Sequence, residues 1–153
     1  MKLWLLRHGE AQAHARSDAE RVLTARGIAQ VQQSAQRLLG QDIGAMLVSP
    51  YVRAQQTAQQ VQLALDPPLP LATVSWLTPD SDLREVLRQL DALDDRPRLL
   101  VGHQPLLGDL AGWLLHGHRQ EPLAMGTACL VELEGEWLAA GQMRLVQQLH
   151  PIV

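Results

Sequence analysis

The sequence predicts an α/β fold, a three-layer sandwich in which helices flank a mostly parallel central sheet. Three short runs at residues 3–6, 45–48 and 99–101 are apolar at every position, which is typical of strands buried on both faces. Longer segments of helical period separate these runs, so the strands are expected to run parallel with helical crossovers. The 153-residue chain has no internal repeat or low-complexity tract and is expected to form one domain over residues 1–153.

The first half of the chain alternates strands with helices. Leu3–Leu6 predicts the first strand. Thr24–Leu39 predicts a helix because its apolar residues share one face, and Gly40 is expected to end it. Ala45–Val48 predicts the second strand, and Pro50 suits the first turn of the helix that follows.

The second half repeats this alternation and then changes at the tail. Leu71–Trp76 is a weaker strand candidate, and Asp82–Leu93 has the period of a helix. Leu99–Val101 predicts another buried strand, and Pro105 is expected to open a helix that reaches Leu115. The tail is expected to form a hairpin around Gly135 from residues 128–134 and 142–149.

Composition and charge narrow the classes of function. Apolar residues make up 46% of the chain and charged residues 19%, a balance typical of globular proteins. A net charge of −3 gives no general attraction to nucleic acid or to an anionic membrane. The one cysteine, Cys129, lies in an apolar run and cannot form an internal disulfide, which favours a reducing compartment. The expected location is therefore the cytoplasm, with neither nucleic acid nor a membrane as a partner.

Polar residues of one chemical kind follow three of the predicted strands. The first strand ends at Arg7 and His8, Arg53 lies one turn into the helix after the second, and His103 follows the strand at 99–101. Ligands of open α/β sheets bind beyond the carboxyl ends of the strands. The two histidines and two arginines are therefore expected to meet at one edge of the sheet.

Such a cluster suits phosphoryl transfer. Two guanidiniums offer forked donors that match phosphate oxygens, and a neutral imidazole is a good nucleophile near neutral pH. The glycine after His8 lets the backbone approach a bound group closely. The sequence contains no metal-ligand pattern and no P-loop, so we expect no cofactor and expect the positive side chains to stabilise the transferring charge.

Three motifs resemble those of the histidine phosphatase superfamily, which includes the phosphoglycerate mutases. They are Arg7-His8-Gly9 after an N-terminal strand, the segment Ser49-Pro50-Tyr51-Val52-Arg53 with Thr57, and Val101-Gly102-His103-Gln104-Pro105. The first pattern alone is weak, whereas all three in this order are specific. The resemblance implies a phosphoglycerate-mutase-like fold and a covalent phosphohistidine intermediate.

The chain is also similar over nearly its whole length to the short phosphohistidine phosphatase branch, SixA. Ser17-Asp18, Leu23-Thr24 and Leu77-Thr78-Pro79 carry this resemblance, together with the short total length. It implies that His8 is the nucleophile and that Arg7, Arg53 and His103 bind the phosphoryl group. It also implies a phosphohistidine-bearing protein as substrate, such as a histidine phosphotransfer domain of a two-component relay.

The short interval between Arg53 and His103 favours a phosphohistidine over a phosphate ester. Larger relatives usually carry a general acid in an insertion there, and among Asp80, Asp82 and Glu85 none stands out by its spacing. An alkoxide leaving group needs such an acid, whereas an imidazole with a pKa of about 6.5 departs more readily. A small-molecule phosphomonoesterase of the same superfamily and a non-catalytic phosphoprotein-binding module remain the alternatives.

Other polar residues carry weaker signals. Glu10 follows the first motif and is expected either near the site or in solvent, while Arg16 and Arg21 are expected to be solvated or to help dock an acidic partner. His116 and His118 lack a third ligand at metal-binding spacing and are read as surface residues.

Overall fold

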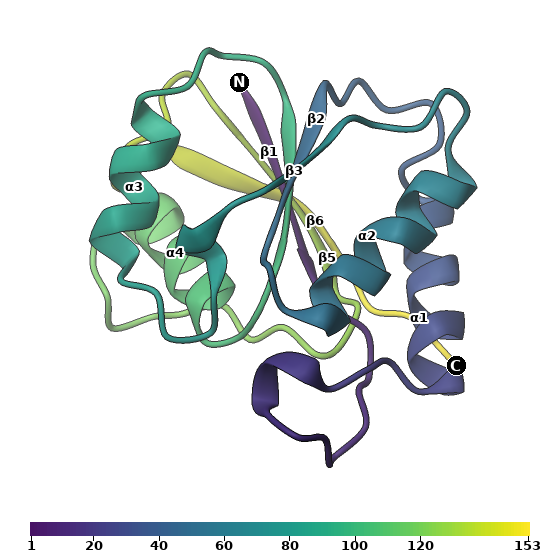
Figure 1. Ribbon diagram of the computed structural model, residues 1–153. Coiled ribbons are helices and arrows are strands. Elements are labelled where there is room, and N and C mark those ends of the chain that lie inside the picture. The colour runs from purple at the N-terminus through teal and green to yellow at the C-terminus, as the bar shows by residue number, and fades with distance from the viewer.

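The computed structural model describes residues 1–153 and contains one mixed sheet of six strands in the order β3-β2-β4-β1-β5-β6 (Figure 1). The strands are β1 (Lys2–Arg7), β2 (Ala45–Val48), β3 (Leu71–Thr73), β4 (Arg98–Gly102), β5 (Leu130–Gly135) and β6 (Met143–Leu149). The first four strands are parallel, and β5 and β6 extend the sheet as an antiparallel hairpin beside β1. The predicted α/β sandwich with a mostly parallel sheet is confirmed.

Two pairs of helices cover the two faces of the sheet. Figure 1 shows α1 (Ala25–Gln36) and α2 (Val52–Ala64) on one side, and α3 (Leu83–Asp91) and α4 (Leu106–His116) on the other. Because β1 and β4 are buried on both faces, their alternate residues feed two separate apolar cores. Trp4 and Leu6 pack toward α1 and α2, whereas Leu3 and Leu5 pack toward α3 and α4.

Several boundaries differ from the sequence expectation for local reasons. Thr24 caps α1 by accepting a hydrogen bond from the Gly27 amide, so the helix begins at Ala25. It ends at Gln36, before the turn that leads to Gly40, where φ is +76°. The helix after β2 begins at Val52, two residues later than predicted from Pro50.

The weakest strand prediction was partly wrong. Strand β3 covers only Leu71–Thr73, and Trp76 belongs to the short 3-10 helix η2 (Ser75–Leu77). Leu77 is fully buried, so turning the chain there places an apolar side chain in the core that an extended edge strand would leave outside. A second 3-10 helix, η1 (Asp18–Glu20), lies in the segment between β1 and α1.

The strand register brings the carboxyl ends of three strands to one level. Arg7 of β1 pairs with Gly102 of β4, and Val48 of β2 pairs with Val101 of β4. The residues that follow these strands therefore emerge side by side at one edge of the sheet. No helix in the structure is both long and apolar enough to span a membrane.

Candidate active site

The structure brings together all four residues that the sequence singled out. The ring centroids of His8 and His103 lie 5.1 Å apart, and Arg53 Nε lies 3.3 Å from His8 Nε2. Arg7 is the last residue of β1, and the His8 amide donates to the Gly102 carbonyl, which joins the ends of β1 and β4. His8, Arg53 and His103 each expose no more than 5% of their surface.

The hydrogen bonds of His8 determine which ring nitrogen is free to react. His8 Nδ1 lies 2.7 Å from the Gly9 carbonyl oxygen, which can only accept, so Nδ1 carries the proton. His8 Nε2 accepts from Arg53 Nε and therefore holds a lone pair. In neutral His8 the lone pair is therefore on Nε2, which points toward the guanidinium of Arg53.

Burial keeps both histidines neutral. It lowers the pKa of His8 to about 4, with Arg53 and Arg7 adding a smaller decrease and the Gly9 carbonyl opposing it. Burial also lowers the pKa of His103 to about 2, with His8 and Arg53 adding to the decrease. A neutral imidazole keeps the lone pair that a nucleophile needs.

Arg53 is held on two sides. Its Nη1 donates to the Asp18 carbonyl oxygen at 2.6 Å, and its Nη2 donates to Asp18 Oδ2 at 3.1 Å. Its guanidinium also lies over the Tyr51 ring, 5.1 Å from the ring centroid. Nε has a single hydrogen, which it donates to His8 Nε2, so each of the three guanidinium nitrogens already has a protein partner, and only the second hydrogens of Nη1 and Nη2 remain for an anion.

Two buried polar atoms in the site have no partner within the protein. They are Arg7 Nε and His103 Nδ1. Arg7 Nη1 donates to the Met125 carbonyl at 2.9 Å, and His103 Nε2 lies 2.7 Å from Ser49 Oγ, so each side chain is fixed by its other nitrogen. A buried polar atom without a partner is costly, and an anion in the site can accept from Arg7 Nε, and from His103 in the tautomer that carries its proton on Nδ1.

The segment between β1 and α1 contributes contacts to the site that sequence reasoning missed. Asp18 of η1 contacts Arg53, and its other carboxylate oxygen lies 3.3 Å from Arg21 Nε. The positive charge of Arg21 makes a minor contribution to lowering the pKa of both His8 and His103. The sequence signal was the Ser17-Asp18 pair, which was noted only as a mark of resemblance.

Backbone contacts fix the position of His8. The Gly9 amide donates to Thr57 Oγ1 of α2 at 3.1 Å, and a side chain on Gly9 would lie 2.5 Å from the Gly27 carbonyl oxygen of α1. Glu10 accepts hydrogen bonds from Thr24 and Arg26, so it fastens this segment to the start of α1. Of the two readings of Glu10, the structure favours a role at the margin of the site.

The three candidate acids are engaged elsewhere. Asp82 caps α3 by accepting from the Arg84 amide, and Asp80 accepts from Thr78 Oγ1. Hydrogen bonds from Gln89 and Arg88 lower the pKa of Glu85, which keeps its carboxylate ionised. None of the three has a hydrogen bond to a residue of the cluster.

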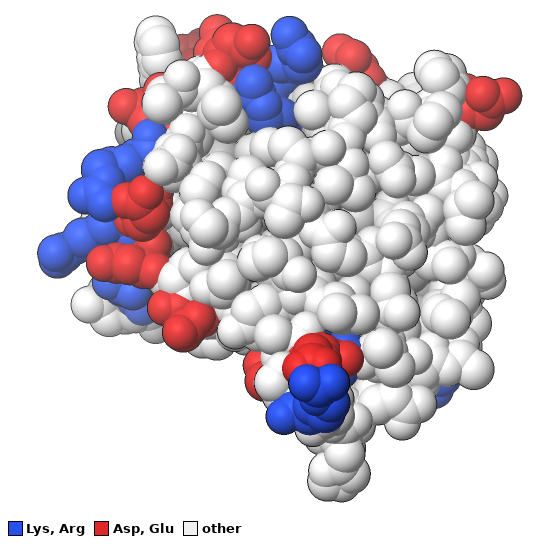
Figure 2. Space-filling model, viewed as in Figure 1, with Lys and Arg blue, Asp and Glu red and all other residues white.

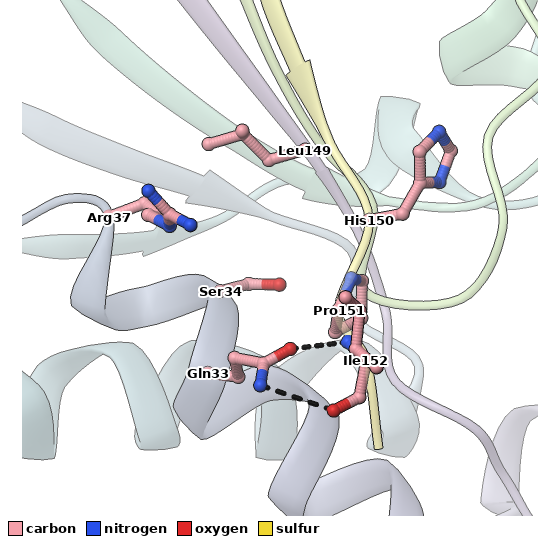
Figure 3. A pocket seen from close by; sticks show the side chains of 7 residues that line it. All are labelled: Gln33, Ser34, Arg37, Leu149, His150, Pro151 and Ile152. Atoms are coloured by element: carbon pink, nitrogen blue, oxygen red, sulfur yellow. Dashed lines mark hydrogen bonds between the residues drawn. The ribbon is translucent and has the colours of Figure 1, made fainter.

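A separate pocket of about 170 Å³ lies between α1 and the C-terminal residues (Figure 3). Gln33 donates to the Ile152 carbonyl and accepts from the Ile152 amide, so the tail is fastened to the helix. The pocket is lined by Gln33, Ser34, Arg37, Leu149, His150, Pro151 and Ile152. It contains none of the four clustered residues and is therefore distinct from the site.

The family model and the individual relatives that match this chain point to the same family. Residues 3–86, more than half of the chain, match the sequence model of the histidine phosphatase superfamily, branch 1. A phosphohistidine phosphatase SixA homolog from Haemophilus influenzae is 33% identical over 165 residues, covering 100% of this chain and 98% of that protein. Phosphohistidine phosphatase SixA from Escherichia coli strain K12 is 36% identical over 122 residues, covering 76% of each chain.

Solved structures agree with the sequence relatives. The structure of the protein histidine phosphatase SixA complexed with tungstate superimposes with a TM-score of 0.88 at 31% identity, covering 99% of this chain and 97% of that one. The α-ribazole phosphatase from Shigella flexneri, with a TM-score of 0.76 at 23% identity and coverage of 95% of each chain, shares the fold. The chain thus belongs to the histidine phosphatase superfamily, in its SixA-type branch.

Proposed function

We propose that this chain removes the phosphoryl group from a phosphohistidine on another protein, through a phosphorylated His8, in a cytoplasmic setting. The observation that carries the proposal is the unprotonated Nε2 of His8, which faces Arg53 beside two further buried nitrogens that lack partners. The SixA relatives, which are described as phosphohistidine phosphatases, support the same substrate class. A histidine phosphotransfer domain of a two-component relay is the specific partner proposed.

In the first step, His8 Nε2 attacks phosphorus and the P–N bond of the substrate breaks. The bonding electron pair returns to the substrate imidazole, which leaves as a neutral ring when its other nitrogen already carries a proton. Arg7, Arg53 and the Nδ1–H of His103 stabilise the charge on the transferring group. The proposed reaction therefore needs neither a metal ion nor a cofactor.

In the second step, water attacks phospho-His8, the new P–N bond breaks, and both protons of the water leave with the phosphate. His8 Nδ1–H still donates to the Gly9 carbonyl, so the ring also leaves as neutral imidazole. Both leaving groups are thus imidazoles, and neither departure requires the carboxylic acid that an alkoxide would need. This symmetry fits a site in which Asp80, Asp82 and Glu85 are engaged elsewhere.

The test compares phosphate release from a phosphohistidine-bearing phosphotransfer domain and from a panel of small phosphate esters. We expect turnover of the phosphodomain with EDTA present, a loss of roughly a thousandfold or more in His8→Ala, and wild-type rates in a His150→Ala control. Release from a small ester alone would retain the site and assign a small-molecule phosphatase. Full activity in His8→Ala would refute the mechanism.

A further inference from the structure

Ser49 contacts one of the two histidines and has no role in the reaction described so far. It follows β2, is fully buried, and its Oγ lies 2.7 Å from His103 Nε2. The same oxygen accepts a hydrogen bond from the Tyr51 amide at 3.2 Å. An amide can only donate, so this contact uses a lone pair of the hydroxyl and leaves its proton available.

The number of donors and acceptors distinguishes the two tautomers of neutral His103. If Nε2 carried the proton, it would donate to Ser49 Oγ, and the hydroxyl proton would be buried with no acceptor among the contacts of Ser49. Nδ1 would then carry a lone pair and could not donate to a bound anion. If Nδ1 carries the proton, the hydroxyl donates to Nε2 and Nδ1–H remains for the anion.

We infer that Ser49 is a positioning residue that fixes His103 as the Nδ1–H tautomer, and so makes its buried nitrogen a donor to the phosphoryl group. The part that concerns catalysis rests on the proposed function, whereas the tautomer itself does not. Both histidines then carry their proton on Nδ1, and a different neighbouring group holds it there in each. The Gly9 carbonyl accepts from Nδ1 of His8, and the Ser49 hydroxyl donates to Nε2 of His103.

With the proton on the same nitrogen, the two rings have opposite roles toward the phosphoryl group. His8 presents the lone pair of Nε2 to phosphorus, while His103 presents the hydrogen of Nδ1 to a phosphoryl oxygen. A neutral donor at His103 also avoids a third full positive charge beside Arg7 and Arg53 before the substrate arrives. The arrangement therefore holds a hydrogen-bond donor in the site without protonating a buried imidazole.

The decisive experiment records long-range nitrogen–proton spectra of histidine-labelled protein near pH 7, with and without inorganic phosphate. The His103→Gln variant assigns the signals. We expect the wild type to show protonated Nδ1 and unprotonated Nε2 at His103, and Ser49→Ala to show a signal for protonated Nε2. Protonated Nε2 at His103 in the wild type would overturn the inference, whatever the variants do.

Activity then tests the consequence for catalysis. We expect Ser49→Ala to lower kcat toward the phosphodomain by about 10- to 100-fold, with a smaller change in KM, because one donor to the transition state is misplaced. Ser34→Ala is the matched control, since Ser34 is a buried serine whose hydroxyl donates to the Ala128 carbonyl. We expect this control to keep the wild-type tautomer of His103.

The two readouts separate the possible failures. A wild-type His103 with protonated Nδ1, in a protein that hydrolyses no phosphohistidine, would reject the proposed substrate and leave the tautomer assignment standing. Ser49→Ala also removes the acceptor of the Tyr51 amide, near the start of α2, so its activity alone does not decide. If this variant kept protonated Nδ1, Ser49 would not be the residue that fixes it.

Discussion

At the scale of single residues, the site combines burial with unused hydrogen-bond donors. His8 lies under its neighbours with 5% of its surface exposed, and burial holds its pKa at about 4. An unfolded histidine has a pKa of about 6.5, so between these values the unfolded chain binds the proton more readily. The stability associated with a neutral His8 is therefore intact above about pH 6.5 and is lost as the pH falls toward 4.

This difference predicts how stability depends on pH. Between pH 7 and pH 5, the free energy of unfolding of the wild type should fall by about 2 kcal/mol more than that of His8→Gln. Urea unfolding at the two pH values measures this. His14 is exposed, so His14→Gln should behave like the wild type, and an equal loss in all three proteins would show that His8 is not held neutral by burial.

Asp18 gives a second prediction at the same scale. Its carboxylate bridges Arg53 and Arg21, and its side chain is 59% exposed, so solvent screens part of its charge. Replacing it by asparagine removes a negative charge that competes with a bound anion. Inorganic phosphate should then inhibit Asp18→Asn roughly fivefold more strongly than the wild type.

Glu20 supplies the control for Asp18, because it lies in the same 3-10 helix and contacts Ser17 and Arg16 instead of the site. Glu20→Gln should leave the inhibition constant near the wild-type value. If both variants changed equally, the cause would be the net charge of the segment. If phosphate bound more weakly to Asp18→Asn, the main role of Asp18 would be to orient Arg53.

Sequence reasoning found some of these residues and missed others for a physical reason. His8, Arg53 and His103 follow or closely follow strands, and the geometry of parallel sheets places such residues together. Asp18 and Arg21 reach the site from an irregular segment, whose path depends on tertiary contacts and not on a repeating pattern. Their charges alone did not distinguish them from solvated surface residues.

At the scale of elements, the buried strands and amphipathic helices were predictable because their side chains repeat with a fixed period. Ala45–Val48 has the predicted bounds, and β1 and β4 extend the predicted runs by one residue at each end. Strand β3 was not predictable in its length, because Leu71 is half-buried while Ala72 and Thr73 are exposed. An edge strand with one pairing partner lacks the continuous apolar run that marks a central strand.

The packing of α1 against the segment after β1 leads to a prediction at this scale. Gly27 lies inside α1, where alanine normally favours the helix, but its Cβ would lie 2.0 Å from the Glu10 carbonyl oxygen. Gly27→Ala should therefore lower the free energy of unfolding by about 2 kcal/mol and displace the backbone next to His8. Thermal unfolding and phosphate release measure the two effects.

Gly126 is the matched control for Gly27. A Cβ at Gly126 meets nothing within 4 Å, and its φ is not positive. Gly126→Ala should keep a stability within about 1 kcal/mol of the wild type. If Gly27→Ala were as stable as this control, the contact between α1 and the Glu10 backbone would not constrain the site.

At the scale of the whole molecule, the clustered histidines and arginines lie at one edge of the sheet, and the adjoining surface carries little charge. In the view of Figure 2, the face over α2 and β3 is nearly free of charged atoms. Helix α2 contains five glutamines and a single charged residue, Arg53, which is buried. A neutral polar surface beside a positively charged site fits the proposed presentation of a phosphoryl group by a folded protein. Such a surface repels neither an acidic nor a basic partner protein.

The central claim is that the phosphoryl group passes through Nε2 of His8. A rapid-quench single turnover, with a radiolabelled phosphodomain and EDTA, tests it most directly when combined with ³¹P spectra and peptide mapping of the labelled enzyme. The account predicts alkali-stable label on Nε2 of His8 that appears before free phosphate and decays as phosphate accumulates, with no label in His8→Ala. Label on another residue or on Nδ1, or undiminished turnover in His8→Ala, would contradict the account.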